Sequence, residues 1–205
     1  GEVVSGRTLL ANAPKGSKVT VVTDPPRALS VGMTQKAGEE FLAKAGIKAK
    51  RTGDTSDDAI IAEQKPERTL EALSAGEVET FGVPKDRVFR IKLSDKDPVS
   101  LHYFKKVTGL SHKPVGILKV QFTFEGLPMV TFYGDENRGK SLYPQDPFKK
   151  VRRGDIGLTN QAREFGPTGE EGYGTNIVGR FVDDLDRLMK DLNEEDTVYI
   201  TEEEL

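Results

Sequence analysis

The sequence predicts a β-rich α+β fold, because segments with the two-residue period of a strand outnumber segments with the period of a helix. Residues 88–93 alternate apolar and polar side chains, as a strand with one buried face does. Residues 116–124 and 129–133 predict two more strands, joined as a hairpin by a connection that contains Gly126 and Pro128. Many strands accompanied by few helices are typical of a β-rich domain.

The first part of the chain is predicted to be extended. Residues 2–10 and 18–22 both indicate strands, the second more strongly because its β-branched residues fit a pleated, half-buried surface. The Asp-Pro-Pro run at residues 24–26 ends the second strand. The sequence therefore predicts a strand-rich tail over residues 1–24.

A compact helix-and-strand module is predicted over residues 25–78. Its helix begins after Thr34, a good N-cap residue, and ends at Gly46, a good C-terminal stop. A strand is expected around residues 59–63, closed by the Gln-Lys-Pro run at residues 64–66. The helix has an apolar face at the usual spacing, formed by Ala37, Phe41, Leu42 and Ala45.

The rest of the chain, residues 79–205, is predicted to form the larger β-rich domain. Pro98 suits the first turn of a helix that Gly109 ends. The apolar stripe of this helix comprises Val99, Tyr103 or Phe104, and Val107. The later elements are strands at residues 154–159 and 175–182, a helix with Leu185, Leu188, Met189 and Leu192, and a strand at residues 197–200.

The composition argues against nucleic acid, metals and cofactors. Lys and Arg total 30 against 33 Asp and Glu, and no segment concentrates basic residues as a phosphate-binding face would. The absence of cysteine excludes disulfides, thiolate zinc sites and iron–sulfur clusters held by this chain. His102 and His112 are too isolated to indicate a metal site or a general base. We therefore expect no metal, no cofactor and no catalytic residue.

The sequence also gives no sign of a membrane partner. No apolar run approaches the ~20 residues that a membrane-spanning helix needs. The start at Gly1 is neither a signal peptide nor an initiator methionine. These features predict a cytoplasmic protein, here in the form of an excised fragment.

Two stretches of the chain are similar to each other. Residues 1–4, Leu10 and residues 19–21 match residues 179–182, Leu188 and residues 198–200 when one single-residue gap is allowed. One interpretation is chance similarity between two strand, loop and strand segments. The other is that residues 1–22 are the tail of a preceding domain of the same kind. Sequence alone leaves both interpretations open.

Residues 31–69 resemble a PASTA repeat. The likeness lies in the Val-Gly-Met-Thr start at residues 31–34, in Gly46 at the helix end, and in the Gln-x-Pro end of the strand at residues 60–66. PASTA units commonly bind cell-wall peptides outside the cell. The resemblance therefore implies a small PASTA-like module, and a peptide- or glycan-binding PASTA protein as one functional alternative.

Three blocks in order resemble a cyclophilin over about residues 86–205. Residues 90–99 are similar to its strand and first helix, residues 154–162 to its Gly-x-x-Ser-Met-Ala-Asn-Ala strand, and residues 177–182 to its late Val-Phe-Gly-Lys-Val-Val strand. The resemblance implies a cyclophilin-like closed β-barrel. The Phe-His-Arg and Gln-Gly-Gly-Asp motifs are absent, and no arginine can be placed beside the prolyl amide. This favours a non-catalytic binding or assembly module, with a divergent peptidyl-prolyl cis-trans isomerase as the alternative.

Nearly the whole chain resembles the methanogenesis marker protein 3 family. The matching stretches are residues 53–60, residues 154–160 and residues 165–177. These are longer archaeal proteins with cyclophilin-like regions. The resemblance implies a cytoplasmic methanogen protein that assists assembly or activation of methyl-coenzyme M reductase, and hence a protein partner.

A partner surface is predicted around the glycine-rich loop at residues 165–174. The cyclophilin alignment puts this loop and its neighbours at strand ends, where the peptide groove of that family lies. The loop offers aromatic anchors and exposed amides, although a tight structural loop would have the same composition. The predicted partner-binding residues are Thr159, Asn160, Phe165, Gly166, Thr168, Gly169, Tyr173 and Asn176.

Overall fold

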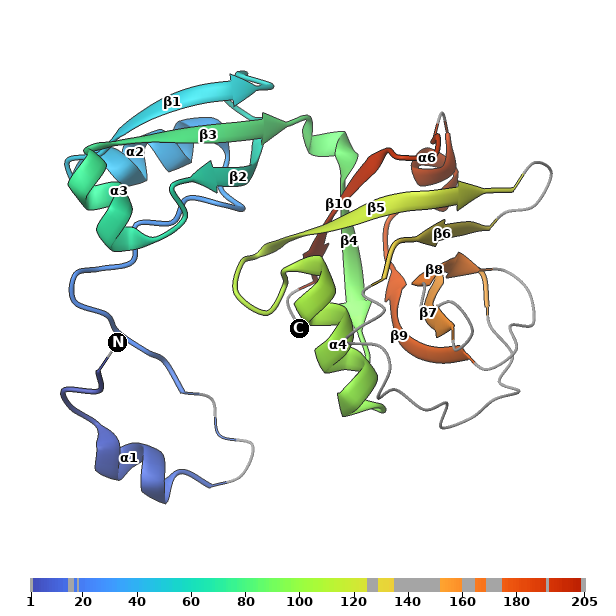
Figure 1. Cartoon of the computed structure of the whole chain (residues 1–205), viewed down its shortest axis with the longest axis horizontal. Coiled ribbons are helices and arrows are strands. Elements are labelled where there is room, and N and C mark those ends of the chain that lie inside the picture. The colour runs from blue at the N-terminus through green and yellow to red at the C-terminus, as the bar shows by residue number, and fades with distance from the viewer. Residues whose placement is uncertain are drawn as a thin grey trace.

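Two β-sheets organise the chain (Figure 1). The computed structural model describes residues 2–14, 17, 19–124, 129–134, 152–159, 165–168, 175–190 and 192–203. A three-stranded sheet belongs to the N-terminal half, and a larger, strongly curled sheet follows it. The predicted β-rich α+β class is confirmed.

The small sheet has the order β1-β3-β2. Strand β3 (Glu77–Val83) lies in the middle, parallel to β1 (Lys48–Gly53) and antiparallel to β2 (Ile60–Lys65). Helices α2 (Gln35–Lys44) and α3 (Thr69–Ala75) pack with this sheet. Their shared apolar cluster comprises Ala28, Leu42, Ile47, Ala72 and Val78.

The expected start and stop of α2 are confirmed. The Thr34 hydroxyl accepts a hydrogen bond from the amide of Ala37 at 3.3 Å, as an N-cap residue does. Gly46 follows the helix with φ +73°, a conformation that favours glycine. The predicted boundary at residue 79, however, falls inside β3. Because β3 pairs with both of its neighbours, the small module continues through Val83.

The larger sheet has the order β10-β4-β9-β7-β8-β6-β5, and β10 also pairs with β5. Helix α4 (Pro98–Thr108) contacts β5 and β9, α6 (Leu185–Met189) leads toward β10, and a 3-10 turn (Lys85–Arg87) precedes β4. The strands are β4 (Val88–Leu93), β5 (Val115–Thr123), β6 (Val130–Phe132), β7 (Asp155–Thr159), β8 (Phe165–Thr168), β9 (Thr175–Phe181) and β10 (Thr197–Glu202).

Strands β6 and β8 are the most weakly paired neighbours in this curled sheet. They share one residue pair, Phe132↔Phe165, whereas β7 and β9 share five pairs. We call the contact between β6 and β8 the seam. The sequence predicted a cyclophilin-like closed β-barrel. The structure instead shows a strongly curled sheet with one weakly paired seam, and the likeness to a cyclophilin stays a prediction. Here we call this sheet, with α4 and α6, the barrel. The short β6 explains the seam, since three residues can offer few ladder hydrogen bonds.

An apolar core fills the barrel. Phe89 and Phe181 meet edge to face with ring centroids 6.4 Å apart. Phe104 of α4 is fully buried in the same cluster. The other buried members are Ile91, Tyr103, Leu118, Val120, Val130, Phe132, Ile156, Leu158, Val178, Leu188, Val198 and Ile200.

A separate apolar cluster joins the small module to the barrel. Val31, Ile61 and Val83 come from the module and pack with Val115 of β5, with Tyr199 of β10 alongside. Two polar contacts lie close by. The Lys113 ammonium pairs with Glu67 at 3.1 Å, and the Arg27 guanidinium donates to the carbonyl of His112 at 2.6 Å. The two sheets therefore share one junction.

Residues 2–24 do not form the strands that the sequence predicted. The described part of this segment contains one short helix, α1 (Arg7–Asn12), with no buried residue, and no strand. β-branched residues stabilise a strand only where a neighbouring strand accepts their backbone hydrogen bonds and packs against their side chains. The described residues supply no such neighbour to this tail.

Candidate functional site

The predicted partner surface is partly described. Thr159 lies at the end of β7, residues 165–168 form β8, and Asn176 lies in β9. The register places Leu158 opposite both Phe165 and Asn176, so these three positions are adjacent. Residues 165–168 were predicted as the start of a loop, and they form a strand instead because they pair with β7. Asn160, Gly169 and Tyr173 lie outside the described residues. The role of this surface in binding a partner stays a prediction.

Asn176 faces the interior of the barrel. Its side-chain amide donates to the Ser100 hydroxyl at 3.0 Å, and the Ser100 hydroxyl donates to the Asp97 carboxylate at 2.5 Å. Asp97 also caps α4, because it accepts the amides of Val99 and Ser100. This buried chain of hydrogen bonds ties the start of α4 to β9. The tie gives Asn176 a structural role.

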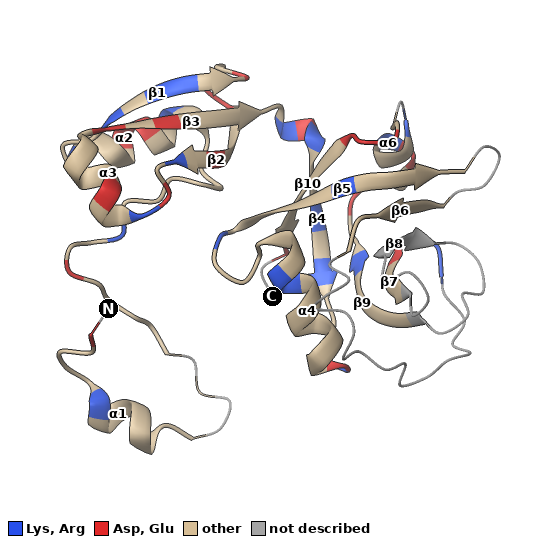
Figure 2. Ribbon diagram, viewed as in Figure 1, with Lys and Arg blue, Asp and Glu red and all other residues tan. Residues whose placement is uncertain are grey.

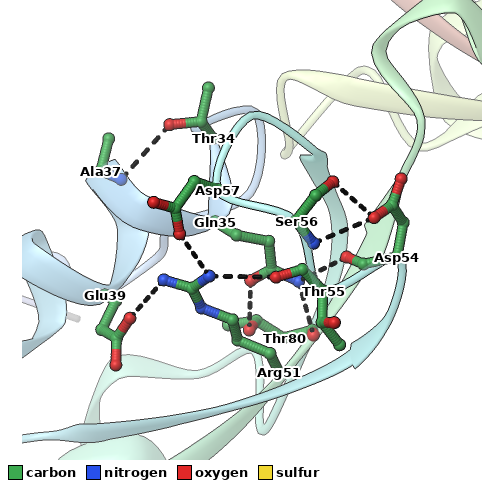
Figure 3. Close-up of polar contacts among 10 residues, drawn as sticks. All are labelled: Thr34, Gln35, Ala37, Glu39, Arg51, Asp54, Thr55, Ser56, Asp57 and Thr80. Atoms are coloured by element: carbon green, nitrogen blue, oxygen red, sulfur yellow. Dashed lines mark hydrogen bonds and ion pairs between the residues drawn. The ribbon is translucent and has the colours of Figure 1, made fainter.

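A second polar cluster closes the turn after β1 (Figure 3). The Arg51 guanidinium donates to Asp57 at 2.8 Å, to the carbonyl of Thr55 at 3.0 Å and to Glu39 of α2 at 2.5 Å. The hydrogen bond to Asp57, and then that to Glu39, raises the pKa of Arg51, while Arg51 lowers the pKa of Asp57. Arg51 thus fastens the turn to α2 through Asp57 and Glu39.

Gln35 supports the same turn from beneath. Its side chain accepts from the Thr80 hydroxyl at 2.8 Å and donates to the backbone carbonyls of Thr80 and Asp54 (Figure 3). Gly82 permits the close approach, since a Cβ there would lie 2.1 Å from the Asp54 carbonyl oxygen. These hydrogen bonds hold the turn against α2 and β3, which gives the cluster a structural role.

Arginines of the barrel are also engaged in ion pairs. Arg90 binds Asp183 through two side-chain bonds of 2.7 and 3.0 Å and through its amide, while Arg187 lies over the Phe89 ring. Arg180 pairs with Asp155 at 3.4 Å. Burial raises the pKa of Asp183, but the bonds from Arg90 outweigh it and the net pKa is lowered. The guanidiniums of Arg90 and Arg180 are thus paired with carboxylates.

The junction between the two sheets contains an open cavity of about 230 Å³. Glu63 and Lys65 line it from β2, Glu79 and Phe81 from β3, and Tyr199 from β10. Burial alternates along β3, and the positions that face the helices, such as Val78, are not part of this lining. The cavity therefore opens on the helix-free face of the small sheet, where it meets the barrel.

Charges on this face are mostly balanced across strands. Figure 2 shows basic residues along β1 beside acidic residues on β3, and the register pairs Lys50 with Glu79, whose charged atoms lie 3.8 Å apart. Unlike Glu79, Glu63 has no partner of opposite charge: within the described ranges its carboxylate makes no hydrogen bond or ion pair. Burial raises the pKa of Tyr199, and the negative charge of Glu63 raises it further.

Sequence reasoning missed this cavity. Its lining comes from three strands that are far apart in the chain, and no local pattern marks such a meeting point. The only available signal was the pair of charged residues beside Gln64 in an otherwise apolar strand. In the part of the chain that the structure describes, no group of three His, Asp or Glu side chains is arranged to hold a metal.

Comparison with known proteins defines the class. Residues 89–203 match a family model described as "Putative peptidyl-prolyl cis-trans isomerase domain". Because the match covers more than half of the chain, the chain belongs to this family of isomerase-like domains. The matched residues coincide with the barrel and exclude the small module.

The similarities that extend over nearly the whole of this chain are to proteins of methanogens. The chain is 39% identical to a UPF0288 protein of Methanothermobacter thermautotrophicus, 37% to one of Methanopyrus kandleri and 32% to one of Methanosarcina acetivorans. Each alignment covers 98% of this chain but only 41%, 42% and 41% of the relative. The chain thus spans about two fifths of the length of these relatives.

These findings bear out the archaeal, methanogen relationship. They include neither the marker protein 3 name nor a PASTA unit, which stay predictions. No helix among the described residues is both long enough and apolar enough to span a membrane.

Proposed function

We propose that this chain is a non-catalytic, isomerase-like module that binds a protein partner, and that the junction cavity holds a basic side chain of that partner. One observation carries the proposal. Glu63, whose carboxylate has no ion-pair partner among the described residues, lines the same cavity as the rings of Phe81 and Tyr199. A carboxylate beside aromatic rings is a suitable receptor for a cation.

An arginine side chain matches this chemistry best. Its guanidinium is planar and weakly hydrated, so it can stack on an aromatic ring and still donate to a carboxylate. Tyr199 is partly buried, so this side of the cavity has reduced contact with water. Reduced hydration strengthens both kinds of interaction, because they are screened less than on an open surface.

Lys65 determines how the proposal can be tested. Lys65 lines the same cavity, so its positive charge repels a bound cation, whereas the charge of Glu63 attracts it. Removing the charge of Glu63 should therefore weaken the binding of a cation, and removing the charge of Lys65 should strengthen it. Glu77 lies on the same strand as Glu79 but does not line the cavity, so it serves as a matched control.

The expected result is that a capped Ala-Ala-Arg-Ala-Ala peptide binds the chain, and that the same peptide with Gln in place of Arg does not. Nitrogen-15 NMR titration should show shifts at the amides of Phe81 and Tyr199. Glu63→Gln should weaken binding by about fivefold, the size of a partly exposed ion pair. Lys65→Gln should tighten it.

The Glu77→Gln variant should bind as the original chain does, because its charge lies outside the cavity. Equal shifts with both peptides, or an affinity that Glu63→Gln leaves unchanged, would contradict the proposed site. The finer role implied by resemblance, assistance to methyl-coenzyme M reductase, remains part of this proposal as the predicted identity of the partner.

Prolyl isomerisation is the second candidate function, and the family description favours it. Two arginines of the described barrel, Arg90 and Arg180, argue against it, because both are paired with carboxylates. Isomerisation in cyclophilins needs an arginine free to donate to the prolyl nitrogen.

An isomerase assay decides between the two functions. Uncatalysed X-Pro isomerisation takes tens to hundreds of seconds, so acceleration is easily measured. We expect the chain to leave the relaxation rate of a model X-Pro peptide unchanged. Acceleration that a destabilised barrel variant abolishes would show instead that the barrel is an enzyme.

A further inference from the structure

Within the N-terminal tail, residues 2–22 expose apolar side chains that a folded segment would bury. Its exposed large apolar residues are Val3, Val4, Leu9, Leu10, Val19, Val21 and Val22. Single exposed apolar residues are normal, but a cluster of them in one short segment indicates a surface that packs against something. The described residues of the barrel and the small module do not cover it.

The same sequence pattern occurs in the barrel with the opposite burial. In the alignment of residues 1–4 and Leu10 with residues 179–182 and Leu188, Leu10 is 50% exposed and Leu188 only 2%. After the single-residue gap, Val21 is 78% exposed and its counterpart Ile200 is fully buried. Four of the matched positions, Phe181, Leu188, Val198 and Ile200, belong to the core of the barrel, whereas Val182 is exposed.

Helix α1 adds an observation that the sequence comparison did not contain. Without any gap, Arg7 aligns with Leu185, and these are the first residues of α1 and α6. The sequence predicted an extended chain at residues 2–10, so a helix at this position is independent support for the alignment. Both stretches therefore have a short helix between two β-branched or apolar segments.

The two copies differ in their neighbours. In the barrel, β10 is paired with β4 on one side and with β5 on the other, and β9 is paired with β4 and β7. In the described part of the tail, no residue belongs to a strand. The tail has the side chains of the β9-α6-β10 unit but lacks the strands that such a unit needs.

We propose that residues 2–22 are the closing strand-helix-strand unit of a second barrel of the same architecture. Its partner is a set of strands equivalent to β4, β5 and β7, which cover the tail as those strands cover β9 and β10. Relatives more than twice the length of this chain have room for such a set. The tail is therefore an interaction surface for a second barrel within the longer protein.

Hydrogen exchange on two proteins tests this assignment. One is the full-length Methanothermobacter thermautotrophicus relative, and the other is the present chain. In the present chain, tail amides should exchange as fast as an unstructured peptide. In the longer relative, the segment aligned with residues 2–22 should exchange at least roughly a hundredfold more slowly, because core strands open far more rarely than exposed segments.

Three outcomes would overturn the proposal. Fast exchange of the tail segment in both proteins would show that no second barrel covers it. Protection that grows with the concentration of the present chain would assign the surface to a second copy of the chain. A lower unfolding temperature of the barrel in Leu10→Asp would show that the tail packs on this barrel, whereas the proposal expects no change in that variant.

Discussion

Replacement of Phe104 by alanine is expected to lower the free energy of unfolding of the barrel by about 3–5 kcal/mol, the range found for emptying a buried phenylalanine site. Phe104 is fully buried on α4 and belongs to the main core cluster. Strands β5 and β9 hold α4 in place, so the surrounding structure can relax little into the space. Denaturant unfolding followed by circular dichroism measures the change.

The matched control is Val99→Ala. Val99 lies on the same helix but is 57% exposed, so its truncation should change the free energy of unfolding by less than about 0.5 kcal/mol, as surface substitutions usually do. A loss for Phe104→Ala no larger than for Val99→Ala would mean that α4 does not pack on the barrel as described. A loss in the expected range would show that this helix is part of the barrel core.

The helix that carries both residues shows what local sequence can predict. Pro98 and Gly109 were expected to begin and end it, and the structure has α4 from Pro98 to Thr108 with Gly109 at φ +86°. Residues 88–93 were predicted as a strand and form β4. Both predictions depended on short-range features, alternation and helix-ending residues, that act without knowledge of the rest of the fold.

Other features depend on contacts between distant residues, and the sequence did not reveal them. Strand β3 alternates burial, with Glu77 and Glu79 exposed, and no strand was predicted there from the sequence. Its place at the centre of the small sheet depends on β1 and β2 together. The strands predicted in the tail failed for the complementary reason, because strand-forming residues had no neighbour to pair with.

The candidate site follows the same rule. The register brings β7, β8 and β9 side by side, although the sequence predicted a loop where β8 lies. The inward side chain of Asn176 depended on Ser100 of a distant helix, which no local pattern announces. The junction cavity joins Glu63 and Tyr199, which only the folded chain brings together.

Gln64→Leu is expected to destabilise the small module by about 3 kcal/mol, since each buried polar group left unpaired costs about 1–3 kcal/mol. Gln64 is fully buried. Its oxygen accepts the amide and hydroxyl of Ser30 at 2.8 and 2.7 Å, and its nitrogen donates to the carbonyls of Ala28 and Pro66 at 2.9 and 3.1 Å. Leucine has a similar size but cannot replace any of these bonds. Native-state hydrogen exchange at amides of α2 and β3 measures the loss.

Lys65→Leu is the neighbouring control, because the Lys65 side chain is exposed and makes no hydrogen bond or ion pair within the described ranges. It should leave exchange in α2 and β3 unchanged. Gln64 belongs to the Gln-Lys-Pro end that suggested a PASTA repeat, so the comparison also tells whether that motif serves the fold. If Gln64→Leu exchanged like Lys65→Leu, water would have to satisfy Ser30 and Ala28, and the motif would need another explanation. Faster exchange in Gln64→Leu alone would show that this glutamine fastens residues 28–30 to β2.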